Sequence, residues 1–88
     1  MTATDPYENV PTALVYDTFA ETATQLTGRY VHKSDTAPTA EERQQWWQKV
    51  MDLRDVKRSV PAHDRTQLIA HIQRWTAELK VLKAEQHG

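Results

Sequence analysis

The sequence predicts an all-α fold, a three-helix bundle in which the second and third helices form an antiparallel hairpin and the first packs across them. Two stretches carry stripes of large side chains in alternating steps of four and three, a spacing that places each set on one face of an α-helix. The stripes are Trp46, Val50, Leu53, Lys57 and Val60, then Leu68, Ile72, Trp75, Leu79 and Leu82. Because only a short turn around Pro61 separates them, we expect these two helices to fold back on each other.

The first helix is predicted over about 12–27. Its stripe has the same spacing and consists of Tyr16, Phe19, Ala23 and Leu26. Gly28 follows directly and suits the position after a helix, because glycine accepts a positive φ at little cost. The composition of residues 14–19 would also allow a strand, but a single strand would have no second strand to pair with. We therefore expect a helix.

The second helix has a clear N-terminal signal. Thr39 and Glu42 have the spacing of a capping box, in which a threonine hydroxyl and a glutamate satisfy free amides at the helix start. They predict a helix over about 39–59, preceded by a connection over 29–38 in which Tyr30 contacts the bundle.

The third helix is predicted over about 62–83. Pro61 suits the turn or the first helical position, because the fixed φ of proline fits both. Asp64 and Gln67 offer a second capping arrangement one turn later. The chain is thus expected to form one helical domain over 11–84, with a flexible tail at 1–10 and a frayed end at 85–88.

The composition argues against an enzyme. The chain has no cysteine and only two glycines, so neither a thiol nucleophile nor a glycine-rich phosphate loop is available. His63 and His71 are too far apart on one helix to bind a single metal ion, and His71 is expected on the polar face of its helix. We therefore expect no catalytic residues, no cofactor and no metal.

The sequence also predicts that the protein does not enter a membrane. Neither an apolar run of spanning length nor a targeting segment is present in it, and we expect a cytoplasmic location. At 88 residues, one domain is near the size at which a single core provides enough stability.

Trp47 begins a second stripe on the middle helix, beside that of Trp46. The candidate partner surface consists of Arg43, Trp47, Met51, Arg54 and Arg58. In one interpretation the middle helix touches two neighbours, and Trp47 packs inside the bundle with Met51; we expect this arrangement. In the other, both side chains stay partly exposed and anchor a partner, since Trp, Met and Arg are enriched at protein interfaces.

Basic side chains gather around the predicted hairpin tip. The candidates for an anion or nucleic-acid contact are Arg54, Lys57, Arg58 and Arg65. Aspartates are interleaved with them, and Asp55 can pair with Arg58 at a spacing of three residues. Because the net charge is −1 and the basic side chains are opposed, we expect a solvated turn rather than a nucleic-acid footprint.

The sequence thus predicts a small protein–protein interaction module that self-associates as a homodimer. Its expected partners are itself and an unidentified protein. A chain of this size without disulfide or metal gains stability from pairing, and symmetric dimers are the commonest solution. The alternative is a small nucleic-acid-associated regulator that uses the basic hairpin tip.

Overall fold

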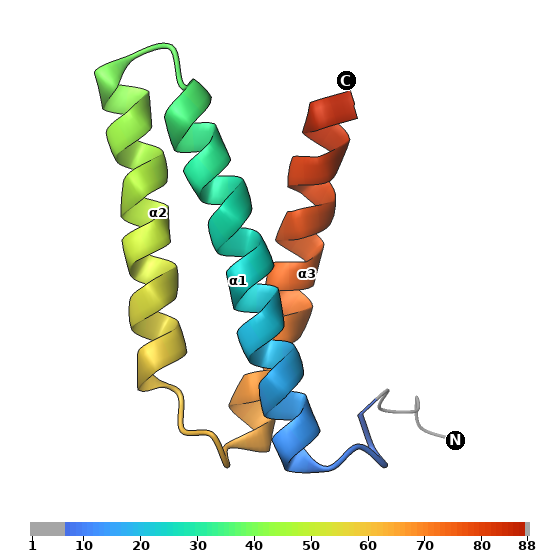
Figure 1. The fold of residues 1–88 in the computed structure, drawn as a ribbon. Helices are drawn as coiled ribbons and strands as arrows, with labels where there is room; N and C mark the ends of the chain where they lie inside the picture. Colours follow the sequence, from blue (N-terminus) through green and yellow to red (C-terminus); the bar gives the residue numbers. More distant parts are fainter. Residues whose placement is uncertain (1–6, 88) are drawn as a thin grey trace.

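The structure, a computed structural model, describes residues 7–87, with side chains described as far as Glu85. Three α-helices make up most of this range: α1 (Thr12–Thr36), α2 (Ala40–Ser59) and α3 (Arg65–His87). No strand is present in the described range. The predicted all-α, three-helix fold is confirmed (Figure 1).

The central helix is α1. It packs against both α2 and α3, and between residues 7 and 87 no close backbone contact joins α2 to α3. Figure 1 shows α2 and α3 on either side of α1. The packing of the first helix against both others is therefore confirmed, but the helix that pairs closely with α2 is α1 and not α3. The apolar stripes predicted that one face of each helix is covered by a neighbouring helix. They did not specify which neighbour covers it.

Gly28 does not end α1. The helix continues for two further turns to Thr36, φ at Gly28 is not positive, and the connection shrinks to residues 37–39. An interior glycine costs about 1 kcal/mol relative to alanine. The extra turns bury Tyr30 and Ser34, and the Ser34 hydroxyl donates to the backbone carbonyl of Arg43 on α2 (3.2 Å). This packing offsets the cost of the glycine, which explains why the predicted end at residue 27 was wrong.

The predicted capping of α2 is confirmed, since the backbone amide of Glu42 donates to the Thr39 hydroxyl (3.1 Å). For α3 the chain uses the later of the two starts. The Gln67 amide donates to one oxygen of Asp64 (3.2 Å), and the Gln67 side chain donates to the other (2.7 Å). Pro61 lies in the turn, and α3 begins at Arg65 rather than at 62.

Both ends of the described chain adopt regular backbone structure. At the C-terminal end α3 extends through His87, where fraying was expected from 85, and Gly88 lies outside the described residues. At the other end, the predicted tail forms a turn in which the Val10 amide donates to the Tyr7 carbonyl (3.0 Å). The guanidinium of Arg65 donates to the Val10 carbonyl (2.6 Å), so this turn is tied to the start of α3. The rest of the predicted tail, 1–6, lies outside the described residues.

The core lies between α1 and its two neighbours. Phe19, Leu26 and Leu68 are fully buried, and the Phe19 ring packs on that of Trp75 (5.1 Å between centroids). All five stripe residues of α3 are buried. In the α2 stripe, Val50, Leu53 and Val60 are buried, whereas Trp46 and Lys57 are half-buried. The core therefore covers only the stripe of Val50 and Leu53 on α2. The second stripe, which begins at Trp47, is not covered.

Candidate functional site

Trp47 and Met51 lie on the surface of α2, with 45% and 37% of their areas exposed. The expectation that they pack inside the bundle is wrong. The reason is the arrangement of the helices: α2 packs closely against α1 alone, so only one of its two stripes is covered by this chain.

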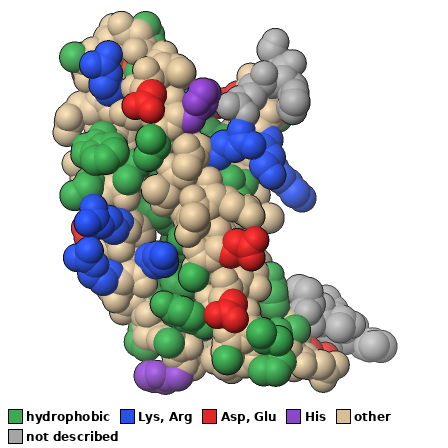
Figure 2. Space-filling model, viewed as in Figure 1, with side chains coloured by type: hydrophobic (Ala, Val, Ile, Leu, Met, Phe, Trp, Pro, Cys, Tyr) green, Lys and Arg blue, Asp and Glu red, His purple; other side chains and the backbone are tan. Residues whose placement is uncertain are grey.

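Basic side chains flank this exposed pair. At 100° per residue, five side chains fall within a sector of about 80° on α2, which we call the α2 face. The α2 face consists of Arg43, Trp47, Met51, Arg54 and Arg58. No carboxylate falls in this sector, because Asp52 and Asp55 lie farther around the helix. Figure 2 shows hydrophobic and Lys or Arg side chains gathered over α2 on this side of the molecule.

The cations of the α2 face have no ion-pair partners in the described part of the chain. The ion pair found there joins Lys33 to Glu85 (3.1 Å). The predicted pairing of Arg58 with Asp55 does not form, although the spacing allows it. A surface pair of this kind gains little over hydration, about 0.3 to 0.5 kcal/mol, so the arginine remains available to an external anion.

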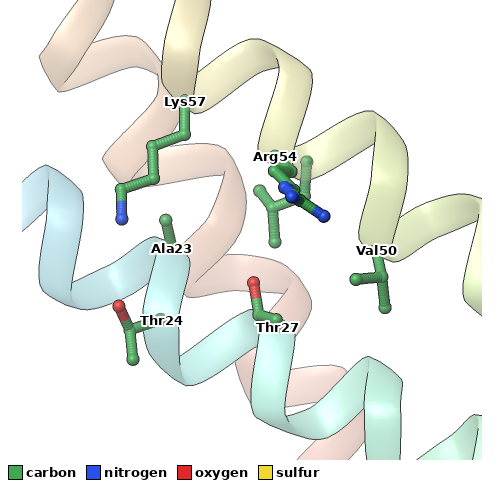
Figure 3. Close-up of a pocket in the computed structure, with 7 residues that line it drawn as sticks. Ala23, Thr24, Thr27, Val50, Arg54 and Lys57 are labelled. Atoms are coloured by element: carbon green, nitrogen blue, oxygen red, sulfur yellow. The ribbon is translucent and has the colours of Figure 1, made fainter.

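A groove of about 250 Å³ separates the α2 face from α1. Its lining consists of Ala23, Thr24, Thr27, Val50, Leu53, Arg54 and Lys57. Figure 3 shows Lys57 extending from α2 toward α1, with Thr24 and Thr27 on the opposite wall. The floor is mostly apolar, while the cationic groups stand on the α2 side. The groove can therefore accept a side chain with an apolar body and a negatively charged end.

The structure brings together three of the four predicted anion contacts. Arg54, Lys57 and Arg58 line a second hollow with Tyr16 of α1, which continues the first groove toward the start of α1. Arg65 is separate from them: it binds the Val10 carbonyl, and its second terminal nitrogen is buried. Its role is to hold the N-terminal turn, and the sequence offered no signal for that long-range bond.

His71 is packed into the core edge rather than displayed on a polar face. Its ring stacks on Trp75 (5.2 Å between centroids), and its Nδ1 atom is buried with no hydrogen-bond partner in the described structure. Burial, and then the charge of Arg74, lower the pKa of His71 below its usual value. No group of three or more His, Asp or Glu side chains among residues 7–85 is placed to hold a metal ion.

The exposed face of α1 was not among the predicted sites. Asp17, Glu21 and Gly28 are all exposed on that face, and Gly28 also lines a hollow with Leu79 and Lys83 of α3. They are four and seven residues apart in sequence, and such spacing returns to the same side of a helix. This spacing could have identified the face from the sequence. Figure 2 shows acidic side chains over the lower half of α1.

Within the described range, no helix combines the length and the apolar character needed to cross a membrane. No protein-family model, curated protein or solved structure matches the chain. The proposals below therefore rest on the geometry and chemistry of the α2 face.

Proposed function

We propose that this chain is a small helical module that binds protein through the α2 face. The observation that carries the proposal is the exposure of Trp47 and Met51 in the middle of a basic, carboxylate-free sector. Covering apolar surface gains about 25 cal/mol per Å². Large side chains surrounded by arginines are the usual centres of binding energy in interfaces between proteins.

The proposed partners are a second copy of the chain and a further protein that carries acidic and apolar side chains. A role in catalysis is not part of the proposal, which rests on exposed apolar and basic side chains and not on a reaction centre. Cytoplasm is the proposed location, and the absence of cysteine is in keeping with a compartment where disulfides are rare.

Crosslinking from the α2 face tests this function. A photo-crosslinking residue replaces Trp47 in the native host, and a matched control carries it at Thr76, an exposed position on α3. We expect protein adducts from position 47, identified by mass spectrometry, and few from position 76. Equal adduct levels from the two positions would contradict the proposed function.

A second candidate is binding of nucleic acid, favoured by one observation: Arg54, Lys57 and Arg58 line a single hollow and none is ion-paired in the described part of the chain. The net charge of −1 and the adjacent Trp47 favour protein instead. We expect labelled DNA and RNA to show no micromolar binding by fluorescence anisotropy at physiological salt. Salt-dependent binding would favour nucleic acid over protein as the partner if the substitutions Arg54→Ser, Lys57→Ser and Arg58→Ser abolish it.

A further inference from the structure

The antiparallel arrangement of α1 and α2 brings specific residues to the same level. The connection between them is only residues 37–39, so residues at equal distances from it lie side by side. The bond from Ser34 to the Arg43 carbonyl and the shared groove lining of Thr27 and Val50 show this register. Counting down both helices places Glu21 level with Arg54.

Two exposed stripes run next to each other in that register. The α2 stripe is Trp47, Met51, Arg54 and Arg58; the α1 stripe, read in the opposite direction, is Gly28, Thr24, Glu21 and Asp17. Both advance in steps of four, three and four, so each stays on one side of its helix. The basic end of one stripe is therefore level with the acidic end of the other, and Trp47 is level with Gly28. Figure 2 shows basic side chains over α2 and acidic side chains over the lower half of α1 on the same face of the molecule.

Gly28 lines an open hollow beside Leu79 and Lys83 of α3, and no contact within the chain requires a glycine there. Its φ is not positive, and a Cβ built at this position would meet no atom within 4 Å. Alanine would suit the interior of a helix better by about 1 kcal/mol. A glycine on an exposed helix face does permit the close approach of a flat ring to the backbone, and Trp47 is the exposed ring at this level.

We propose that a second copy of the chain covers this face, in a symmetric dimer whose two-fold axis runs along the groove between α1 and α2. Rotation about an axis parallel to the helices keeps every residue at its level. It places the α2 stripe of each chain over the α1 stripe of the other, so the same contact forms at two places in the dimer. Arg58 then meets the partner's Asp17, Arg54 meets the partner's Glu21, and Trp47 lies on the partner's Gly28.

Charge complementarity identifies the occupant as a second copy. A surface that carries both stripes is complementary to itself, which is the requirement for a two-fold interface. Two helices about 30 Å long and 10 Å wide offer a face of about 600 Å² in projection. A standard interface takes about 800 Å² of accessible surface per partner, and the accessible area of a helical face exceeds its projection, so pairing takes up the whole of this face and forms a four-helix bundle. The inference rests on the proposed function, because it assigns the α2 face its first partner.

Charge reversal tests the pairing with two variants and their mixture. The first carries Arg54→Glu and Arg58→Glu; the second carries Asp17→Arg and Glu21→Arg. All four positions are exposed, so both variants keep the fold, which circular dichroism checks. Light scattering on a size-exclusion column at micromolar concentration measures the mass.

We expect the parent protein to be a dimer and each variant alone to be a monomer, with dimerisation at least about 100-fold weaker because like charges then face each other. An equimolar mixture of the two variants is expected to restore the dimer, since each acidic stripe then faces a basic one. Arg74→Glu with Lys80→Glu on α3 is the matched control and leaves the dimer intact. Gly28→Leu, which fills the site of the partner's Trp47, weakens the dimer.

Three results would overturn the pairing: a monomeric parent protein, variants that remain dimers, or a mixture of folded variants that remains monomeric. These outcomes are separate from failure of the proposed function. A monomer whose position 47 still crosslinks to a different protein retains the protein-binding role and excludes the second copy as its partner.

Discussion

The hydroxyl of Tyr30 on α1 donates a hydrogen bond to the carboxylate of Glu78 on α3, across 48 positions of sequence. Tyr30 is 5% exposed, whereas Glu78 is half-buried and lines a surface hollow with it. Burial, followed by the hydrogen bond to Glu78 and its negative charge, raises the pKa of Tyr30 far above its usual value of 10.0. The bond thus joins α3 to the two turns of α1 that follow Gly28.

Tyr30→Phe is expected to lower the free energy of unfolding by about 1.5 to 3 kcal/mol, the range for a hydrogen bond to a charged group. The parent protein should also lose stability as pH rises above 10, because the unfolded chain then releases the phenolic proton while the folded chain retains it. The variant should lose less. Urea unfolding at a series of pH values measures both effects, and Tyr16→Phe on the same helix is the control. An unchanged pH profile in Tyr30→Phe would show that the bond does not form in solution.

His71 gives a pH dependence of opposite sign. Because its pKa in the folded chain lies below the usual value of 6.5, the unfolded chain takes up a proton first as pH falls. The free energy of unfolding is therefore expected to decrease as pH falls below 6.5, and His71→Gln should reduce this decrease. His32→Gln, at an exposed position of α1, is the control.

Trp75→Ala is expected to cost about 3 to 5 kcal/mol, because Trp75 is only 6% exposed and its ring packs on those of Phe19 and His71. For a chain of this size the total stability is about 4 to 13 kcal/mol, so this loss is a large part of it. Thermal melting followed by circular dichroism measures the change. Val81→Ala, on an exposed part of the same helix, should change stability by about 0.5 kcal/mol or less. A Trp75→Ala variant that melts within a few degrees of the parent would contradict the core described above.

Thr39→Ala is expected to cost about 1 kcal/mol, since the Glu42 amide loses its acceptor at the start of α2. The matched control is Thr36→Ala. Its hydroxyl donates to the His32 carbonyl inside α1 (2.9 Å), which already accepts helix bonds, so its removal should matter less. Urea unfolding of both variants provides the comparison. Equal losses would show that the cap contributes nothing specific.

Gly28→Ala is expected to stabilise the monomer by about 0.5 to 1 kcal/mol, because the position is helical and a Cβ there meets no neighbour. The measurement requires the Arg54→Glu and Arg58→Glu background, in which pairing does not contribute. Destabilisation in that background would show that the surroundings of Gly28 are closer than the structure has them.

Local signals in the sequence were enough to locate α2 and the onset of α3. Thr39 binds an amide three residues away, and so does Asp64, so these contacts depend on nothing distant in the chain. The stripes of α2 and α3 were equally informative about burial, because helical spacing alone puts Leu53 and Leu79 on a covered face. For α3 the sequence offered two adjacent starts, at residue 62 and after Asp64. The prediction took the first, and the helix uses the second.

The end of α1 could not be predicted from the local signal of Gly28. Its preference for helix ends is a property of one residue, whereas continuation of α1 depends on burying Tyr30 and Ser34 against α3 and α2. The gain comes from groups nine to 48 positions away in the chain. Such pairs cannot be identified from spacing within one helix.

The sequence by itself determined that the chain is helical, where α2 begins and ends, and that the stripes of Leu53 and Leu79 are buried, because backbone capping and helical periodicity act over a few residues. Only the tertiary structure decided that α1 is central, that Trp47 and Met51 are exposed, and that Arg54 lies level with Glu21. These features depend on which helix covers which stripe. Each apolar stripe fits against any other, so burial alone does not choose the pairing. The length of α1 and the short connection after it bring α2 back along α1, and this leaves the second stripe of α2 on the surface.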